Sequence, residues 1–467
     1  MGIKFGTDGW RAVISEDFTF ENVRIVSQAI ADHFKGDGAN FVIGYDSRFL
    51  SEKYAELVAE VLAGNGIKVL ISDKAVPTPL VSLAIKNKRL SGGIMITASH
   101  NPPVYNGIKI KAPYGGSADE NITKAVESKL GKNEIKSIPF KKCIDSKAAE
   151  FIDLKPDYIK FIKAYLDMKL LKKSRLKILV DCMHGVGDGY IPEILKDTDI
   201  HITEMRTGRD PLFGGVNPEP IPKNLDAVFQ AVKKGDYDIA IVNDGDADRI
   251  GAVTPDGEYM NAGAIMALLL LHFVEDRNWR GSVVKTITNT TLIERIARKY
   301  NLKLHETPVG FKYICRLMLE EDVLIGGEES GGIGVKNYMP ERDGMLLGIL
   351  LVEMLAYRKK SIGDIIREME KEYGRFCYSR IDMEYPDDKK RKLMKFLKES
   401  PPDKILEKPV IETKSTDGYK FILKDSSWLI MRLSGTEPIL RIYAEAPTKT
   451  LANKYLEAGQ AIALNIP

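Results

Sequence analysis

Three aspartates stand at alternate positions in residues 244–249, whose sequence is Asp-Gly-Asp-Ala-Asp-Arg. Apolar runs at residues 239–242 and 250–253 flank this segment and predict that it is a tight loop between two strands. Carboxylates so close together repel one another, which favours a bound cation, and their oxygens suit Mg²⁺, whose ligands lie at about 2.1 Å. A calcium EF-hand is disfavoured because Arg249 and Pro255 stand where its Gly and Glu should be. A plain polar turn remains the alternative.

A serine that could act as a nucleophile lies in a second loop. Ser99 belongs to residues 97–102, Thr-Ala-Ser-His-Asn-Pro, which directly follow an apolar run. The segment is therefore predicted to lie at the end of a strand, where α/β proteins bind their ligands. Taken alone, such a serine is more often a turn residue or a helix cap. A hydrolase nucleophile elbow would need Gly two residues earlier, and Ser99, Ser330 and Ser434 all lack it, which disfavours acyl transfer.

Two further loops carry groups that suit polar ligands. In residues 326–332, Gly-Gly-Glu-Glu-Ser-Gly-Gly, Glu328 and Ser330 can hydrogen-bond to sugar hydroxyls, and the glycines allow a ligand to approach the backbone. Residues 432–438, Arg-Leu-Ser-Gly-Thr-Glu-Pro, combine a guanidinium, two hydroxyls and backbone amides, a set that can cradle a phosphate. Taken alone, the first segment could be an ordinary glycine-rich loop, and the second could be an ordinary hairpin turn.

Two weaker segments contribute cations. Residues 5–11 form a glycine-containing turn that ends in Arg11. In residues 107–111, Gly-Ile-Lys-Ile-Lys, the strand period places Lys109 and Lys111 on one face, for which a solvated strand face is the alternative. The phosphate-binding loop of nucleotide hydrolases is missing, and residues 185–190 lack the last Gly of the dinucleotide fingerprint, which disfavours a hydride-transfer enzyme.

The elements that position these loops alternate between strand and helix patterns. Short runs rich in Val and Ile recur, and helical patterns follow them, as in α/β layers: residues 41–44, 178–180, 239–242 and 323–325. After the first run, Ser51 is predicted to be the N-cap of a helix that Gly64 and Gly66 end. From about Cys377 onward, strands at residues 419–423, 428–431 and 439–444 and a helix from about Leu451 indicate a small α+β domain.

Size and composition narrow the class of protein. The 467 residues suggest about three or four domains, and 44% apolar with 28% charged residues is typical of globular proteins. A net charge of +3 gives no electrostatic case for a nucleic-acid or membrane partner. Residues 262–274, the most apolar stretch, are too few to span a bilayer and predict a buried helix. Four widely spaced cysteines and the lack of a secretory signal pattern favour a cytoplasmic location.

Taken together and in this order, the segments resemble the α-D-phosphohexomutase family, which includes phosphoglucomutases and phosphomannomutases. The resemblance extends from Phe5 to Glu437, and the serine loop and the three-aspartate loop are its specific parts. It implies three related α/β mixed-sheet domains and a smaller C-terminal α+β domain around a central cleft. We place the domains at residues 1–154, 155–256, 257–373 and 374–467.

The resemblance also implies a role for each motif. Ser99 would carry a phosphoryl group, and Mg²⁺ would be held by Asp244, Asp246, Asp248 and Ser99. Around the phosphoserine it places Arg11, His100, Lys109 and Arg249. As contacts of the substrate's sugar and of its other phosphate it implies Lys312, Glu328, Ser330, Arg432, Ser434, Gly435 and Thr436. Two departures are Gly332, where many bacterial relatives have His, and Leu433, where Pro is frequent.

The implied activity is the interconversion of hexose 1-phosphate and hexose 6-phosphate through a hexose 1,6-bisphosphate, which also serves as activator. The Glu-Glu-Ser loop and Gly-Phe-Lys-Tyr at residues 310–313 favour glucose, with mannose and glucosamine phosphates as alternatives. More distant alternatives are a metal-dependent sugar phosphatase and a sugar-phosphate sensor without turnover. The expected partners are small hexose phosphates, with no nucleic acid and no membrane, and the expected state is a monomer or homodimer.

Overall fold

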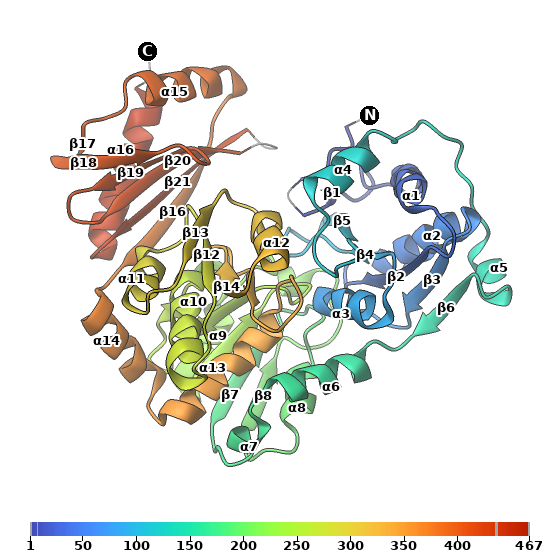
Figure 1. Ribbon diagram of the computed structural model, residues 1–467, viewed down its shortest axis with the longest axis horizontal. Helices are drawn as coiled ribbons and strands as arrows, with labels where there is room; N and C mark the ends of the chain where they lie inside the picture. Colours follow the sequence, from blue (N-terminus) through green and yellow to red (C-terminus); the bar gives the residue numbers. More distant parts are fainter. Residues whose placement is uncertain (1, 7, 435–437, 466–467) are drawn as a thin grey trace.

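The computed structural model describes residues 2–6, 8–434 and 438–465, which form four sheets in chain order (Figure 1). The first sheet has the strand order β1-β5-β4-β2-β3-β6; β2, β3, β4 and β6 are parallel, and β5 runs antiparallel to β4 and β1. Its strands are β1 (Trp10–Val13), β2 (Asn40–Tyr45), β3 (Lys68–Ser72), β4 (Gly92–Ile96), β5 (Tyr105–Lys111) and β6 (Ala149–Ile152). Its helices are α1 (Phe20–Phe34), α2 (Ser51–Gly64), α3 (Thr78–Lys88), α4 (Glu120–Glu127) and α5 (Phe140–Asp145).

The second sheet has the order β11-β10-β9-β7-β8 and is also mixed, because β10 runs antiparallel to β9 and β11. Its strands are β7 (Lys177–Asp181), β8 (His201–Met205), β9 (Ile239–Asn243), β10 (Ile250–Val253) and β11 (Tyr259–Met260). The helices and short helical turns of this unit are α6 (Lys155–Tyr165), α7 (Met168–Leu171), α8 (Tyr190–Leu195), η1 (Phe213–Gly215), η2 (Pro222–Asn224) and α9 (Asp226–Lys234).

The third sheet has the order β13-β12-β14-β15, with β15 antiparallel to β14. Its strands are β12 (Ser282–Thr286), β13 (Leu304–Thr307), β14 (Val323–Gly327) and β15 (Ile333–Val335). The helices of this unit are α10 (Ala262–Leu271), η3 (His272–Asp276), α11 (Thr291–Lys299), α12 (Phe311–Glu320), α13 (Gly344–Arg358) and α14 (Ile362–Tyr373). Helix α10 is buried almost throughout, as the apolar stretch 262–274 predicts.

The fourth sheet is antiparallel throughout, in the order β16-β21-β20-β19-β18-β17. Its strands are β16 (Cys377–Glu384), β17 (Lys404–Ile405), β18 (Lys408–Lys414), β19 (Tyr419–Leu423), β20 (Trp428–Leu433) and β21 (Ile439–Ala446), and its helices are α15 (Asp387–Glu399) and α16 (Lys449–Leu464). The fold class expected from the sequence, three α/β units with mixed sheets and a smaller C-terminal unit, is therefore confirmed.

The cores show how the units are joined. One apolar cluster runs through all of the first three units, from Val42 to Tyr373, whereas the fourth unit has a separate core from Tyr385 to Ala463. A small cluster around Ile287 and Trp428 connects the third and fourth units. Figure 1 shows the fourth unit at one end of the molecule, next to β12 and β13 and away from the first unit. Among the described residues, no helix has both the length and the apolar character needed to cross a membrane.

One helix start differs from the sequence prediction. Helix α2 begins at Ser51, but its N-cap is Leu50, and Ser51 does not cap it. The Ser51 hydroxyl donates to Asp46 Oδ1 instead, at 2.8 Å. The cap prediction is wrong because a buried carboxylate after β2, which local sequence does not reveal as an acceptor, competes for the hydroxyl.

Candidate active site

The three-aspartate loop joins β9 to β10 and is fully buried. Ala247 adopts φ 56°, in the left-handed region, which closes the tight turn. Carboxylate oxygens of Asp244, Asp246 and Asp248 lie within 4.8 Å of one another. Among the described residues, Asp246 Oδ1 and Asp248 Oδ1 are buried without a hydrogen-bond partner. Two orphaned anionic oxygens in one small cluster are what a bound cation would satisfy, so these residues fit a metal ion such as Mg²⁺.

The charges of this loop support the same conclusion. Burial and the neighbouring charges of Asp246 and Asp248 raise the pKa of Asp244 well above its usual range. Burial also acts to raise the pKa of Asp246, but Lys109, the Thr78 hydroxyl and Arg342 together outweigh it and lower that pKa. Asp244 thus remains poorly compensated beside two other buried carboxylates, and a divalent cation would relieve this repulsion.

The serine loop follows β4, and its backbone is strained at the residue of interest. Ser99 has φ 53°, a conformation that L-residues rarely adopt and that clusters at functional sites. Its amide donates to Thr97 Oγ1 at 2.8 Å. Its hydroxyl donates to Asp244 Oδ2, also at 2.8 Å, across 145 residues of sequence. The structure therefore brings the serine hydroxyl and the aspartate cluster into direct contact.

Arg48, which sequence analysis missed, holds the serine loop in place. Its guanidinium is fully buried and donates to the carbonyl oxygens of Ser99 and Asn101, at 2.6 and 2.7 Å, and to those of Pro102 and Tyr105. Asp46 pairs with Arg48 Nε at 3.1 Å. An arginine in a loop after a strand gives no local signal of this role, because its partners are backbone atoms about fifty residues away.

A glycine permits the contact between the two loops. A Cβ built on Gly245 would lie 2.7 Å from the Ser99 carbonyl oxygen, closer than real Cβ atoms approach. On the other side, Thr78 at the start of α3 donates its hydroxyl to Asp246 Oδ2 and its amide to the Asp246 carbonyl oxygen. The first unit thus holds the aspartate loop from two directions. Sequence analysis missed Thr78 as well.

Lys109 is the main cation of the aspartate cluster. It lies on β5 but is 1% exposed, so the solvated-face alternative is wrong for this residue. Its ammonium contacts Asp246 at 2.6 Å, Asp248 at 2.7 Å and Asp8 at 3.2 Å. Burial alone would lower the pKa of Lys109, but these three carboxylates together raise it. Lys109 therefore stays protonated over the physiological range.

Asp8 and Arg342 complete this network, although sequence analysis assigned a role to neither. Arg342 Nη2 contacts Asp8 Oδ2 at 2.5 Å and Asp248 Oδ2 at 2.8 Å, and its guanidinium lies over the ring of Phe311. The network joins the first, second and third units around the site. The residue before Arg342, Glu341, pairs with the buried Lys111 of β5.

The other residues expected around the serine also lie near it. His100 Nδ1 is 3.5 Å from Ser99 Oγ, and burial together with several cations lowers the pKa of His100 well below its usual range. Arg249 donates its amide to Asp244 Oδ1 at 3.1 Å and points its side chain along the acid cluster, with Nε 3.9 Å from Asp248 Oδ1. Arg11 Nη1 donates to Asn101 Oδ1 at 2.7 Å.

The sugar loop follows β14 and reaches the same region. Glu328 is 6% exposed, and burial raises its pKa to about 7. Gly331 packs against the end of the aspartate loop, since a Cβ there would lie 2.7 Å from the Ile250 carbonyl oxygen. A Cβ at position 332 would lie 2.5 Å from Arg342 Cδ, so Gly suits this position while Arg342 keeps its place. Ser330 is partly exposed on the same loop.

The expected phosphate cradle lies on the fourth unit. Arg432, on β20, donates from Nε to Asp417 at 2.7 Å, and Ser434 follows the end of that strand. Gly435 and Thr436 lie outside the described residues. Lys312, near the start of α12, has its ammonium over the ring of Tyr313, 5.1 Å from the centroid. Within the described parts of the chain, Lys312, Ser330 and Arg432 form no hydrogen bond or ion pair with the serine loop or the aspartate loop.

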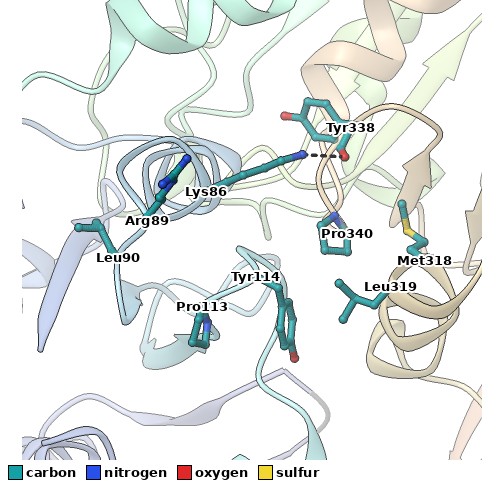
Figure 2. Close-up of a pocket in the computed structure, with 9 residues that line it drawn as sticks. All are labelled: Lys86, Arg89, Leu90, Pro113, Tyr114, Met318, Leu319, Tyr338 and Pro340. Atoms are coloured by element: carbon teal, nitrogen blue, oxygen red, sulfur yellow. Dashed lines mark hydrogen bonds between the residues drawn. The ribbon is translucent and has the colours of Figure 1, made fainter. Parts of the chain in front are cut away.

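A cavity of about 560 Å³ opens elsewhere, between the first and third units. Figure 2 shows Lys86 and Arg89 on one side of it and Met318 and Leu319 on the other. None of the site residues predicted from the sequence lines it.

Comparison with known proteins agrees with this fold. Family models described as phosphoglucomutase/phosphomannomutase match the chain in four parts: α/β/α domain I at residues 2–136, domain II at 156–257, domain III at 261–373, and the C-terminal domain at 393–458. The fold and site thus define a phosphotransferase of the mutase class. The chain belongs to the phosphoglucomutase/phosphomannomutase family.

Individual relatives are similar over their whole lengths. A protein named phosphoglucomutase/phosphomannomutase from Thermococcus kodakarensis is 31% identical, with 98% of each chain covered. One named phosphoglucosamine/phosphogalactosamine mutase from Sulfurisphaera tokodaii is 29% identical, with 97% of each covered. The crystal structure of a putative phosphomannomutase from Thermus thermophilus superposes with a TM-score of 0.88 at 33% identity, covering all of both chains.

Proposed function

We propose that this enzyme interconverts hexose 1-phosphates and hexose 6-phosphates, with glucose preferred, through a phosphorylated Ser99 and a bound hexose 1,6-bisphosphate. The observation that carries the proposal is the 2.8 Å hydrogen bond from Ser99 Oγ to Asp244 Oδ2, because it brings the serine hydroxyl into contact with three carboxylates that could hold a metal ion. The family membership of the whole chain supports it.

A metal ion and nearby side chains would together offset the negative charge of the phosphoryl group at Ser99. Mg²⁺ held by Asp244, Asp246, Asp248 and Ser99 would offset charge on the transferring oxygens. Lys109, protonated among three carboxylates, stabilises charge and does not accept a proton. The neutral imidazole of His100, 3.5 Å from Ser99 Oγ, adds a polar contact without a further charge.

In the first half of the reaction, the bond between phosphorus and Ser99 Oγ breaks as a bond forms between phosphorus and the oxygen of the free sugar hydroxyl. The sugar hydroxyl loses its proton, and Ser99 Oγ gains one to become a hydroxyl again. In the second half, the bisphosphate turns around and the opposite phosphate returns to Ser99. In both orientations the enzyme must bind the sugar and the distal phosphate, which is the phosphate that is not being transferred. We assign the sugar to Glu328 and Ser330, and the phosphate to a further set: Lys312, Arg432, Ser434, Gly435 and Thr436.

We further propose that the chain divides functionally at residues 1–154, 155–256, 257–373 and 374–467. The four sheets support this division, and so does the separate core of the last unit. A fourth unit with its own core can move to admit a sugar phosphate and then exclude water from the phosphoserine.

The test of the mechanism is Ser99→Ala. We expect mutase turnover to fall to background while the melting temperature stays near that of wild type, because the change removes one hydroxyl and no packing. Mass spectrometry of wild-type enzyme should find phosphate on the peptide that contains Ser99. Ser146→Ala, an exposed serine of the first unit, is the matched control and should retain full activity. Wild-type turnover in Ser99→Ala would disprove the mechanism.

The substrate needs its own experiment, because relatives carry different sugar names. Rates on glucose, mannose and glucosamine 1-phosphates with Mg²⁺ and a trace of the matching bisphosphate would rank the three. A higher kcat/KM on glucosamine 1-phosphate would overturn the glucose preference and leave the mutase assignment intact. Net release of inorganic phosphate, instead of hexose 6-phosphate, would identify a phosphatase.

A further inference from the structure

Asp417 lies in the turn between β18 and β19 and contacts two units at once. Its Oδ2 accepts a hydrogen bond from Arg432 Nε, at 2.7 Å, within the fourth unit. The same oxygen accepts the amide N–H of Val309, at 3.0 Å, from the third unit. One carboxylate oxygen therefore links the arginine assigned to the phosphate with the loop that leads into α12.

The turn is built to bring this carboxylate close to Arg432. Gly418 has φ 79°, which favours glycine, and a Cβ there would lie 2.4 Å from the Met431 carbonyl oxygen and 2.9 Å from Arg432 Cα. The backbone of the turn thus rests directly on β20 at the arginine. A larger residue at position 418 would push the Asp417 carboxylate away from the guanidinium.

The bond to Asp417 leaves the arginine with a donor for a ligand. Arg432 Nη1 is buried and has no hydrogen-bond partner among the residues that the structure describes. A buried, unpartnered N–H of a guanidinium is costly unless a ligand accepts from it. Because the carboxylate fixes Nε, the orientation of the planar guanidinium is also fixed. A guanidinium held in one orientation favours recognition of a phosphate.

Val309 connects the turn to another proposed ligand contact. It stands three residues before Lys312, and Gly310, with φ 133°, is the N-cap residue of α12, which begins at Phe311. Other contacts across this boundary include the bond from Lys420 Nζ to the Ile287 carbonyl oxygen, at 2.8 Å, and the one from Lys414 Nζ to Glu306, at 3.0 Å.

We propose that Asp417 is a positioning residue that orients Arg432 toward the substrate's distal phosphate and ties the fourth unit to the Val309–Gly310 loop, which leads into α12 and Lys312. This rests on the proposed function, because the phosphate is the ligand that Arg432 serves. Because one carboxylate makes both contacts, binding of the phosphate by Arg432 and docking of the fourth unit on the third depend on each other.

The kinetic test compares Asp417→Ala with Asp425→Ala, an aspartate in the next turn of the same sheet that accepts the Ser427 amide. Asp417→Ala should raise KM for the preferred hexose 1-phosphate by about tenfold or more, since an arginine without its charged partner is misoriented, while kcat changes much less. Asp425→Ala should keep the wild-type KM. Equal KM values in the two variants would overturn the proposal.

A double-mutant cycle separates positioning from a general loss of stability. In an Arg432→Ala background, Asp417→Ala should cause no further rise in KM, because the residue through which it acts is gone. Additive losses would mean that Asp417 does not act through Arg432.

Hydrogen exchange tests the second contact without turnover. The Val309 amide, measured by mass spectrometry of short peptides, should exchange faster in Asp417→Ala than in wild type, and should stay slow in Arg432→Ala. Unchanged exchange in Asp417→Ala would remove the tie between the units. An inactive wild-type chain would instead refute the proposed function, so the two failures are distinguishable.

Discussion

Asp246 uses its two carboxylate oxygens differently. Oδ2 accepts from Thr78 and Lys109, whereas Oδ1 is buried without a partner in the described parts of the chain. We expect Asp246→Asn to weaken Mg²⁺ binding by about tenfold or more, because an amide is a poorer ligand than a carboxylate. Calorimetric titration measures this without an activity assay. Asp256→Asn, an exposed turn residue of the same unit, should bind as wild type, and equal affinities would contradict the metal assignment.

Glu328 makes stability depend on pH. Burial raises its pKa to about 7 in the folded protein, against about 4.3 for an unfolded chain. Between these values the unfolded state has lost the proton that the folded state still holds, so this residue lowers the free energy of unfolding as pH rises from about 4 to about 7, by about 3 kcal/mol in total.

Glu328→Gln removes this titration, and its stability should therefore fall less between pH 5 and 7 than that of wild type. Urea unfolding at a series of pH values measures the difference. Parallel curves for the two proteins would show that Glu328 is not held protonated by burial.

At the scale of elements, the site depends on how closely two loops approach. The loop after β4 and the loop after β9 meet where Gly245 faces the Ser99 carbonyl oxygen, and a Cβ would come within 2.7 Å of it. Gly245→Ala should push the loops apart by some tenths of an ångström and reduce kcat by about a hundredfold, since misplacements of this order are costly.

The matched control is Gly36→Ala, where a Cβ meets nothing within 4 Å. It should leave kcat unchanged. If Gly245→Ala were as active as Gly36→Ala, the geometry of the loop contact would not matter for turnover.

The sequence predicted the elements around these loops well, because an apolar run followed by glycines or polar residues marks the end of a strand within a few residues. The predicted strands at residues 239–242 and 250–253 correspond to β9 and β10, which pair as antiparallel neighbours. The start of α2 was also found, but not its cap, because Ser51 donates to Asp46. Patterns of spacing locate an element; they do not reveal which buried acceptor a side chain reaches.

At the scale of the whole molecule, a buried ion pair joins the first and third units. Lys111 on β5 and Glu341 are both fully buried and in contact, and Ser82 on α3 donates to the same carboxylate at 3.3 Å. Glu341→Ala leaves a buried ammonium without its partner, and should lower the free energy of unfolding by about 3 to 5 kcal/mol.

Urea unfolding of Glu341→Ala checks this value. Asp197→Ala, which breaks an exposed pair with Lys163, should leave the midpoint near that of wild type. Similar midpoints for both variants would show that the interface does not depend on the buried pair.

The sequence by itself determined the order of the motifs, the strands that precede them and the family, because these follow from residue types and spacings along the chain. Only the tertiary structure decided that Lys109 is buried among three carboxylates, that Arg48 and Thr78 hold the two loops, and that Asp417 contacts Arg432 and Val309. Several of these contacts join residues that are more than a hundred positions apart in the sequence. They depend on how separate sheets pack against one another, and local patterns of apolar and polar residues carry no record of that.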